Sequence, residues 1–201
     1  MVTKKALCCI MSLILLFGAF TLTIHADENT EDTSVSNGYH GIDANRAYLG
    51  QDVLTENIKS AFLFETNSQS LLYCWNADLP QYPASLVKIM TALLVLENTE
   101  LSNTVTVSQS ALDSVSRDAI SADLLAGEII SVEDLLYCMI VKSANDAAAV
   151  LAEYISGTQE AFVSKMNSRA AELGCTGTTY VNAHGLHHDD QVTTARDTCR
   201  I

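Results

Sequence analysis

Ser85 and Lys88 stand three residues apart in the stretch YPASLVKIMTALLVLE, where a strongly apolar segment begins. Residues at this spacing lie on one side of a helix, about one turn apart, so the Lys88 amine can reach the Ser85 hydroxyl. A hydroxyl beside an amine that can take its proton is a typical serine nucleophile with its base. The spacing alone is weak evidence, because S-x-x-K arises by chance about once in 200 residues. The alternative is a helix cap followed by a solvated lysine.

A second polar pair interrupts two apolar helical patterns further along the chain. Ser143 and Asn145 stand two apart in VKSANDAAAV, and no other S-x-N triplet occurs in the sequence. A second serine can carry a proton to a leaving amine, and an amide can both donate to and accept from a peptide-like substrate. The alternative is an N-cap for the helix that follows, a role that does not exclude catalysis.

The segments around these residues predict a hairpin followed by helices. The runs IKSAFLFET and SLLYCWNAD, separated by NSQ, predict a β-hairpin whose aromatic residues, including Trp75, belong to the core. Pro83 precedes a helix whose apolar face is formed by Leu86, Ile89, Met90, Leu93, Leu94 and Leu96. NTVTVS then predicts a short strand.

Capping signals predict three more helices. Ser131 with Asp134 forms a capping box for a helix through about Lys142. NDAAAVLAEYIS predicts a helix ended by Gly157, and TQEAFVSKMNSRAAELG predicts one capped by Thr158 and ended by Gly174. Strands followed by a helix-rich stretch indicate an α/β or α+β domain.

The N-terminal region has the pattern of an export signal. Lys4 and Lys5 precede an apolar run from Ala6 to about Ile24, and cleavage after Ala26 is expected, so residues 1–26 predict a secretory signal peptide, with retention as a membrane anchor as the alternative. Residues 27–50 predict a polar leader, and residues 51–201 the domain. The formal net charge of −13 repels phosphate backbones, so we expect no nucleic-acid partner.

Cysteine and histidine residues do not form a metal-binding pattern. The cysteines that follow the signal are Cys74, Cys138, Cys175 and Cys199. They allow two disulfides in three connectivities, but they lack close pairing, and Cys138 in an apolar helical pattern suits a buried thiol. The stretch HGLHHDD, from His184 to Asp190, has ligand residue types without a helical or C-x-x-C framework, so we expect no metal there.

Five blocks of this sequence, in order, resemble the D-alanyl-D-alanine carboxypeptidases of serine peptidase family S11, the low-molecular-mass penicillin-binding proteins. They are PASLVKIMTALLVLE, LAGEIISVEDLLYCMIVKSANDAAAVLAEYISG, FVSKMNSRAAELG, TTYVNAHGL and TTARD. The resemblance runs from about Lys59 to Asp197 and is far more specific than either short motif. It implies a β-lactamase/transpeptidase-like serine acyl-enzyme fold.

The resemblance also implies a mechanism without metal or cofactor. Ser85 would be the nucleophile, Lys88 the general base, Ser143 a proton relay and Asn145 a substrate-binding residue. The backbone N–H of Ser85 would form half of an oxyanion hole. As a base, Lys88 needs a pKa lowered by burial and neighbouring positive charge.

The implied partners lie in the cell wall. They are a peptidoglycan stem peptide ending in D-Ala-D-Ala, as substrate, and β-lactam antibiotics, as covalent inhibitors. The alternatives are a transpeptidase, a β-lactamase relative, or a non-catalytic wall or penicillin-binding fragment. The implied location is extracytoplasmic, in the cell wall or periplasm or on the outer face of the cytoplasmic membrane.

The sequence departs from the family pattern in two places. No K-T-G triplet follows Thr194 before Ile201, so we expect a truncated sequence in which the closing strands, and any C-terminal segment for peripheral membrane association, are missing. The last five residues, 197–201, predict the start of a helix. Gln191 stands where family members usually carry histidine, which puts a minor local contact in doubt.

Overall fold

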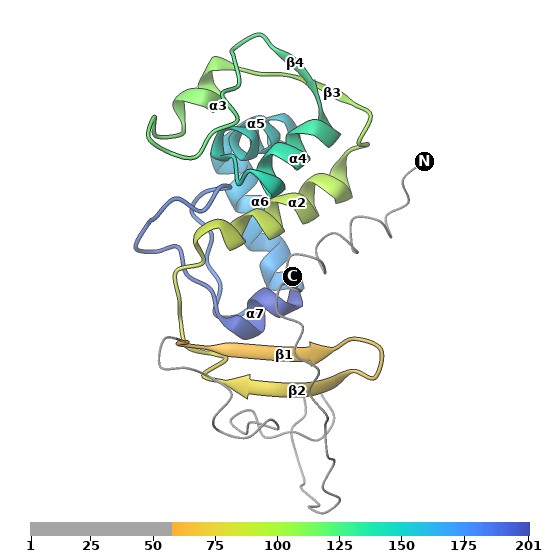
Figure 1. Ribbon diagram of the computed structural model, residues 1–201, viewed down its shortest axis with the longest axis vertical. Helices are drawn as coiled ribbons and strands as arrows, with labels where there is room; N and C mark the ends of the chain where they lie inside the picture. The colour runs from red at the N-terminus through yellow and green to blue at the C-terminus, as the bar shows by residue number, and fades with distance from the viewer. Residues whose placement is uncertain (1–57) are drawn as a thin grey trace, which may run out of the picture. The chain divides into compact units, whose positions relative to one another are not determined.

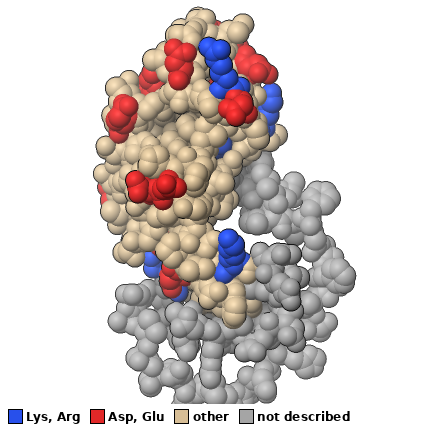
Figure 2. Space-filling model, turned by 90° about the vertical axis from the view of Figure 1, so that its left-hand side faces the viewer, with Lys and Arg blue, Asp and Glu red and all other residues tan. Residues whose placement is uncertain are grey.

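The computed structural model describes residues 58–201. The predicted signal peptide, 1–26, and polar leader, 27–50, lie outside the described residues. Within residues 58–201, no helix is both long and apolar enough to cross a membrane. On the face shown in Figure 2, Asp and Glu are dispersed, and Lys and Arg do not gather into a basic patch.

The predicted hairpin is confirmed. Strands β1 (Ala61–Glu65) and β2 (Ser70–Trp75) pair antiparallel, and helix α7 (Ala195–Arg200) packs against β1 (Figure 1). The prediction that Trp75 belongs to the core is wrong, because its side chain is 44% exposed. Cys74 is buried on the inner face, and successive side chains of a strand point to opposite faces, so Trp75 faces outward.

The four long helices lie where the sequence predicts them, and α5 packs against the other three (Figure 1). In chain order they are α2 (Val87–Asn98), α4 (Val132–Val141), α5 (Asn145–Ser156) and α6 (Gln159–Glu172). The Ser131 and Thr158 hydroxyls cap α4 and α6 by accepting backbone N–H groups. Gly157 ends α5 at a φ of 81°, a conformation that glycine adopts without steric cost.

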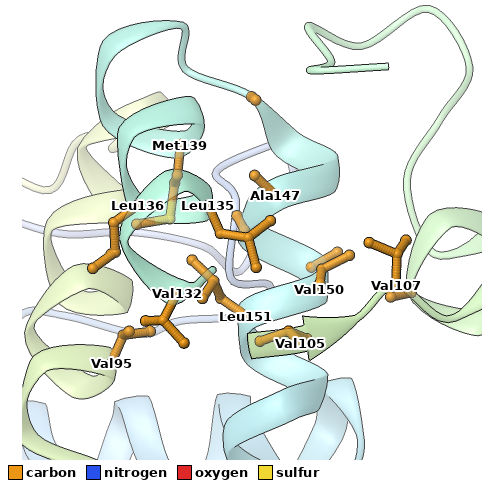
Figure 3. Packing of buried hydrophobic residues seen from close by; sticks show 14 of the residues in the cluster. Val95, Val105, Val107, Val132, Leu135, Leu136, Met139, Ala147, Val150 and Leu151 are labelled. Atoms are coloured by element: carbon orange, nitrogen blue, oxygen red, sulfur yellow. The ribbon is translucent and has the colours of Figure 1, made fainter. Parts of the chain in front are cut away.

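The main hydrophobic core lies between α2, α4 and α5. Figure 3 shows Leu135 of α4 pointing toward α5, where Leu151 lies, and Val95 of α2 beside Val132 of α4. The run of alanines at the start of α5, residues 147–149, is fully buried. Such small side chains allow α2 and α4 to approach α5 closely.

The start of the first long helix differs from the prediction. Residues Ala84–Leu86 form a 3-10 turn, η2, and the α-helix begins only at Val87. Leu86, predicted to face the core, is 53% exposed, whereas Lys88 is buried. A 3-10 turn has three residues per turn instead of 3.6, so it rotates the side chains that precede the α-helix.

Short elements complete the described part of the chain. The predicted strand is β3 (Thr104–Thr106), and it pairs with β4 (Ile129–Ser131), which the sequence does not predict. Helix α3 (Gln109–Asp113) is also unpredicted. The helix expected at 197–201 begins earlier, at Ala195, because the Thr194 hydroxyl caps it.

Candidate active site

Three side chains from two parts of the chain meet at the start of α2. The Ser85 Oγ lies 3.3 Å from the Lys88 Nζ and 2.9 Å from the Ser143 Oγ. Ser85 lies in η2 and Lys88 one turn on, while Ser143 comes from the junction of α4 and α5. Ser85 is exposed and Lys88 is 3% exposed, so an accessible hydroxyl lies against a buried amine.

The amine of Lys88 has two further partners, both of which can only accept. Its Nζ donates to the Asn145 Oδ1 at 2.9 Å and to the His184 carbonyl oxygen at 2.5 Å. With Ser85, these satisfy the three N–H groups of an ammonium. A neutral amine keeps only two N–H groups, which the two acceptors occupy. Its lone pair then faces the Ser85 hydroxyl, the one partner able to donate.

Burial lowers the pKa of Lys88 to about 8. The amine is removed from water, and this disfavours its charged form. The sequence led us to expect that burial and a neighbouring positive charge would lower the pKa of Lys88, and burial is the cause that acts. A useful fraction of Lys88 is therefore neutral near pH 7, whereas an ordinary lysine is almost fully protonated there.

Asn145 connects Lys88 to a neighbouring segment. Its backbone N–H and its Nδ2 both donate to the Ile120 carbonyl oxygen, at 2.8 and 2.9 Å. The Asn145 side chain is 5% exposed, and its contacts with Lys88 and Ile120 use two of its four hydrogen-bonding positions. The Asn145 amide therefore holds the Lys88 amine and the backbone at Ile120 in a fixed relation to each other.

Asp146, next to Asn145, was not predicted as a site residue. Its buried carboxylate accepts from the Ser121 Oγ at 2.7 Å and from the N–H groups of Ala122, at 2.8 Å, and Leu124, at 3.2 Å. Burial acts to raise the pKa of Asp146, but these hydrogen bonds outweigh it and the pKa is lowered. Asp146 thus holds the segment that the Asn145 amide contacts.

Two non-glycine residues of the site have a left-handed backbone. Ser143 has a φ of 60°, and Ala84, before the proposed nucleophile, has a φ of 47°. Such conformations cost of order 1–3 kcal/mol each and persist only where the surroundings enforce them. At Ser143 the next residue is fixed, because the Ala144 N–H donates to the Cys138 carbonyl at 3.1 Å.

The loop that carries the His184 carbonyl passes directly against the Ser85 turn. Gly185 has a φ of 90°, and a Cβ on it would lie 2.6 Å from the Ala84 carbonyl carbon and 3.1 Å from the Ser85 nitrogen. Only glycine fits there. Burial first, and the charge of Lys88 second, lower the pKa of His184 to about 4, so its imidazole is neutral at pH 7.

The remaining histidines of this loop lie at its exposed side. His187 Nε2 is 3.3 Å from Asp189 Oδ1, and its ring meets the Tyr82 ring edge-on at 4.7 Å between centroids. Among residues 58–201, no three His, Cys, Asp or Glu side chains are grouped as metal ligands would be. No disulfide joins the cysteines of this part of the chain.

Comparison with known proteins places the chain in a family. The family model described as D-alanyl-D-alanine carboxypeptidase matches residues 50–201. The D-alanyl-D-alanine carboxypeptidase DacF of Bacillus subtilis is 36% identical over 149 residues, which are 72% of this chain and 38% of DacF. The chain therefore spans less than two thirds of the curated relatives' length.

Solved structures agree with this match. The D-alanyl-D-alanine carboxypeptidase DacD of Francisella tularensis superposes with a TM-score of 0.68 at 30% identity, over 78% of this chain and 38% of that one. A DD-transpeptidase of Streptomyces gives a TM-score of 0.66 at 29% identity, over 74% of this chain and 61% of that one. The predicted α+β, transpeptidase-like fold is confirmed. The chain belongs to the D-alanyl-D-alanine carboxypeptidase family, peptidase family S11.

Proposed function

We propose that the full-length protein is a serine-type D-Ala-D-Ala carboxypeptidase that removes the terminal D-alanine from peptidoglycan stem peptides. The observation that carries the proposal is the contact of the exposed Ser85 hydroxyl with the buried, pKa-lowered amine of Lys88 and with the Ser143 hydroxyl. A nucleophile needs an adjacent base and a route for the proton to the leaving group, and these three side chains supply both.

In the proposed reaction, the Ser85 Oγ attacks the carbonyl carbon of the penultimate D-alanine. Lys88, as the neutral amine, takes the hydroxyl proton. The C–N bond to the last D-alanine breaks, and the departing amine receives a proton through Ser143. Water then hydrolyses the ester on Ser85 and regenerates the hydroxyl.

Asn145 has two proposed roles. We assign it to the substrate amide, as its residue type and place in S-x-N suggest, and its contact with Lys88 supports a second role in orienting the base. We also propose that β-lactams acylate Ser85, that the protein acts outside the cytoplasmic membrane, and that it binds no nucleic acid, metal or cofactor.

A transpeptidase is the second candidate, because a DD-transpeptidase of Streptomyces superposes almost as well as the carboxypeptidase of Francisella tularensis. The two activities share the acyl-enzyme and differ in what attacks it. Incubation of the full-length protein with a stem pentapeptide, with and without an added amino-acid acceptor, separates them by liquid chromatography. We expect free D-alanine and tetrapeptide in both cases, and neither with Ser85→Ala. Acceptor-linked product in excess of the tetrapeptide would overturn the carboxypeptidase proposal.

A further inference from the structure

Gln191 is buried at the back of the loop that carries His184. Its side chain is 2% exposed, and all four hydrogen-bonding positions of its amide are used. The Oε1 accepts from the N–H groups of Val181 and Asn182, both at 3.0 Å. The Nε2 donates to the Asn182 Oδ1 at 3.3 Å and to the Leu186 carbonyl at 3.1 Å. From the sequence, Gln191 is expected to affect only a minor local contact, whereas in the structure its side chain makes four hydrogen bonds.

Asn182 passes this constraint to the residues beside Lys88. Its Oδ1, which Gln191 contacts, also accepts from the Gly185 N–H at 2.7 Å and the His184 N–H at 3.3 Å. Its Nδ2 donates to the Leu186 carbonyl at 2.9 Å. The Asn182 and Gln191 amides therefore hold the turn from Asn182 to Leu186 at both ends, and the His184 carbonyl lies in its middle.

The backbone that carries Gln191 is itself fixed. Val192 exchanges two backbone hydrogen bonds with Thr179, at 2.8 and 3.1 Å. Thr193 exchanges two with Gln81, at 2.8 and 2.9 Å, and Gln81 leads directly into the turn that carries Ser85. Gln191 is thus held from two sides: its amide binds the loop that carries His184, and the backbone that follows it pairs with Gln81, just before the Ser85 turn.

We propose that Gln191 is a positioning residue for acyl transfer, holding the His184 carbonyl against the Lys88 amine. This inference rests on the proposed function, since it needs Ser85 and Lys88 to react. The carbonyl and Asn145 occupy both N–H groups of the neutral amine and leave its lone pair facing Ser85. If the carbonyl moves away, the amine can rotate and the lone pair is no longer aimed at the hydroxyl. A displacement of about 1 Å at a reacting group can cost about 10²-fold in rate.

The test is the acylation of the full-length protein by a fluorescent penicillin. The variants are Gln191→Met, which keeps the length of the side chain and removes its hydrogen bonds, and Gln191→His, which offers one donor and one acceptor. Gln159→Met is the matched control, because Gln159 is a partly buried glutamine whose Nε2 donates to the Ala149 carbonyl at 2.7 Å. Saturating kinetics give three quantities: the limiting rate constant, the apparent affinity and the labelled fraction.

A residue that only stabilises the fold changes the labelled fraction, whereas a positioning residue changes the rate constant of the molecules that react. We expect the limiting rate constant to fall at least tenfold in Gln191→Met and by an intermediate factor in Gln191→His. The apparent affinity should stay within about twofold, and Gln159→Met should keep the wild-type rate constant.

Unchanged rate constants in both Gln191 variants, with only the labelled fraction reduced, would overturn the inference and leave the proposed function intact. If Gln191→Met yields no folded protein, Gln191→Glu, which keeps the acceptor Oε1 and replaces the donor Nε2 by an acceptor, decides by the same criterion. A wild-type protein that is not labelled at Ser85 would overturn the proposed function, and the inference with it.

Discussion

Acylation of Ser85 should accelerate with pH in a way that reports the protonation of Lys88. The reaction needs the neutral amine, so the rate follows the fraction of Lys88 that has lost its proton. With a pKa of about 8, roughly 9% of the amine is neutral at pH 7 and roughly 91% at pH 9, so the rate should rise about tenfold between them. An ordinary lysine of pKa about 10.4 would be only about 0.04% neutral at pH 7.

The assay is the second-order rate constant for labelling by a fluorescent penicillin, measured from pH 6 to pH 10 at constant ionic strength. At low β-lactam concentration this constant reports the free protein. His184 does not complicate the curve, because its pKa is about 4 and it stays neutral throughout. We therefore expect one rising limb with its midpoint near pH 8 and a plateau above pH 9.

The control is Lys88→Met, which fills most of the lysine's volume without an amine. We expect its labelling to fall by at least about 10²-fold, as for loss of a general base, and to lose the limb near pH 8. A flat profile for the wild type, or a midpoint near pH 10, would refute the assignment of Lys88 as a base made available by burial. Near-normal labelling of Lys88→Met would refute it equally.

Three further predictions concern groups around the reacting atoms. Gly185→Ala should destabilise the protein by about 1–3 kcal/mol from its backbone conformation alone, and the clash with Ala84 should add to this and abolish labelling of Ser85. Urea unfolding measures the stability and fluorescent penicillin measures the labelling. A folded, fully labelled variant would contradict the packing described for Gly185. Asp146→Asn should destabilise by about 1–3 kcal/mol for each N–H donor left unpaired. Because the pKa of Asp146 is lower in the folded state, the wild type should lose this stability as pH falls through that pKa, and Asp146→Asn should not. Urea titrations that show the same loss of stability with falling pH in both proteins would contradict this role of Asp146. Ser143→Ala should lower kcat for the pentapeptide by about 10²-fold with KM nearly unchanged, since a proton relay acts mainly in the transition state. A rise in KM alone would instead make Ser143 a binding residue.

The larger elements were predictable because their signals are local. The Ser131 and Thr158 caps, and Gly157 after α5, fix helix ends within a few residues of the chain. The β1–β2 hairpin also forms between neighbouring segments. Strand β4 was missed because its three residues become a strand only by pairing with β3, more than twenty residues earlier.

The site was predictable in its residue types but not in its contacts. Ser85 and Lys88 are neighbours in sequence, and Ser143 could be joined to them only through the family resemblance. The His184 carbonyl carries no sequence signal, because every residue has a carbonyl group and only the fold brings this one to Lys88. Gln191 was underestimated for the same reason, since a buried glutamine with four partners looks in sequence like a polar loop residue.

The most direct test of the central claim, that Ser85 is the nucleophile, is mass spectrometry of the full-length protein after reaction with penicillin. Intact mass counts the adducts, and peptide mapping locates them. We predict one adduct per molecule, on the peptide that contains Ser85, absent from Ser85→Ala and present in an exposed-serine control such as Ser164→Ala. An adduct on any other residue, or one that persists in Ser85→Ala, would contradict the mechanism proposed for this protein.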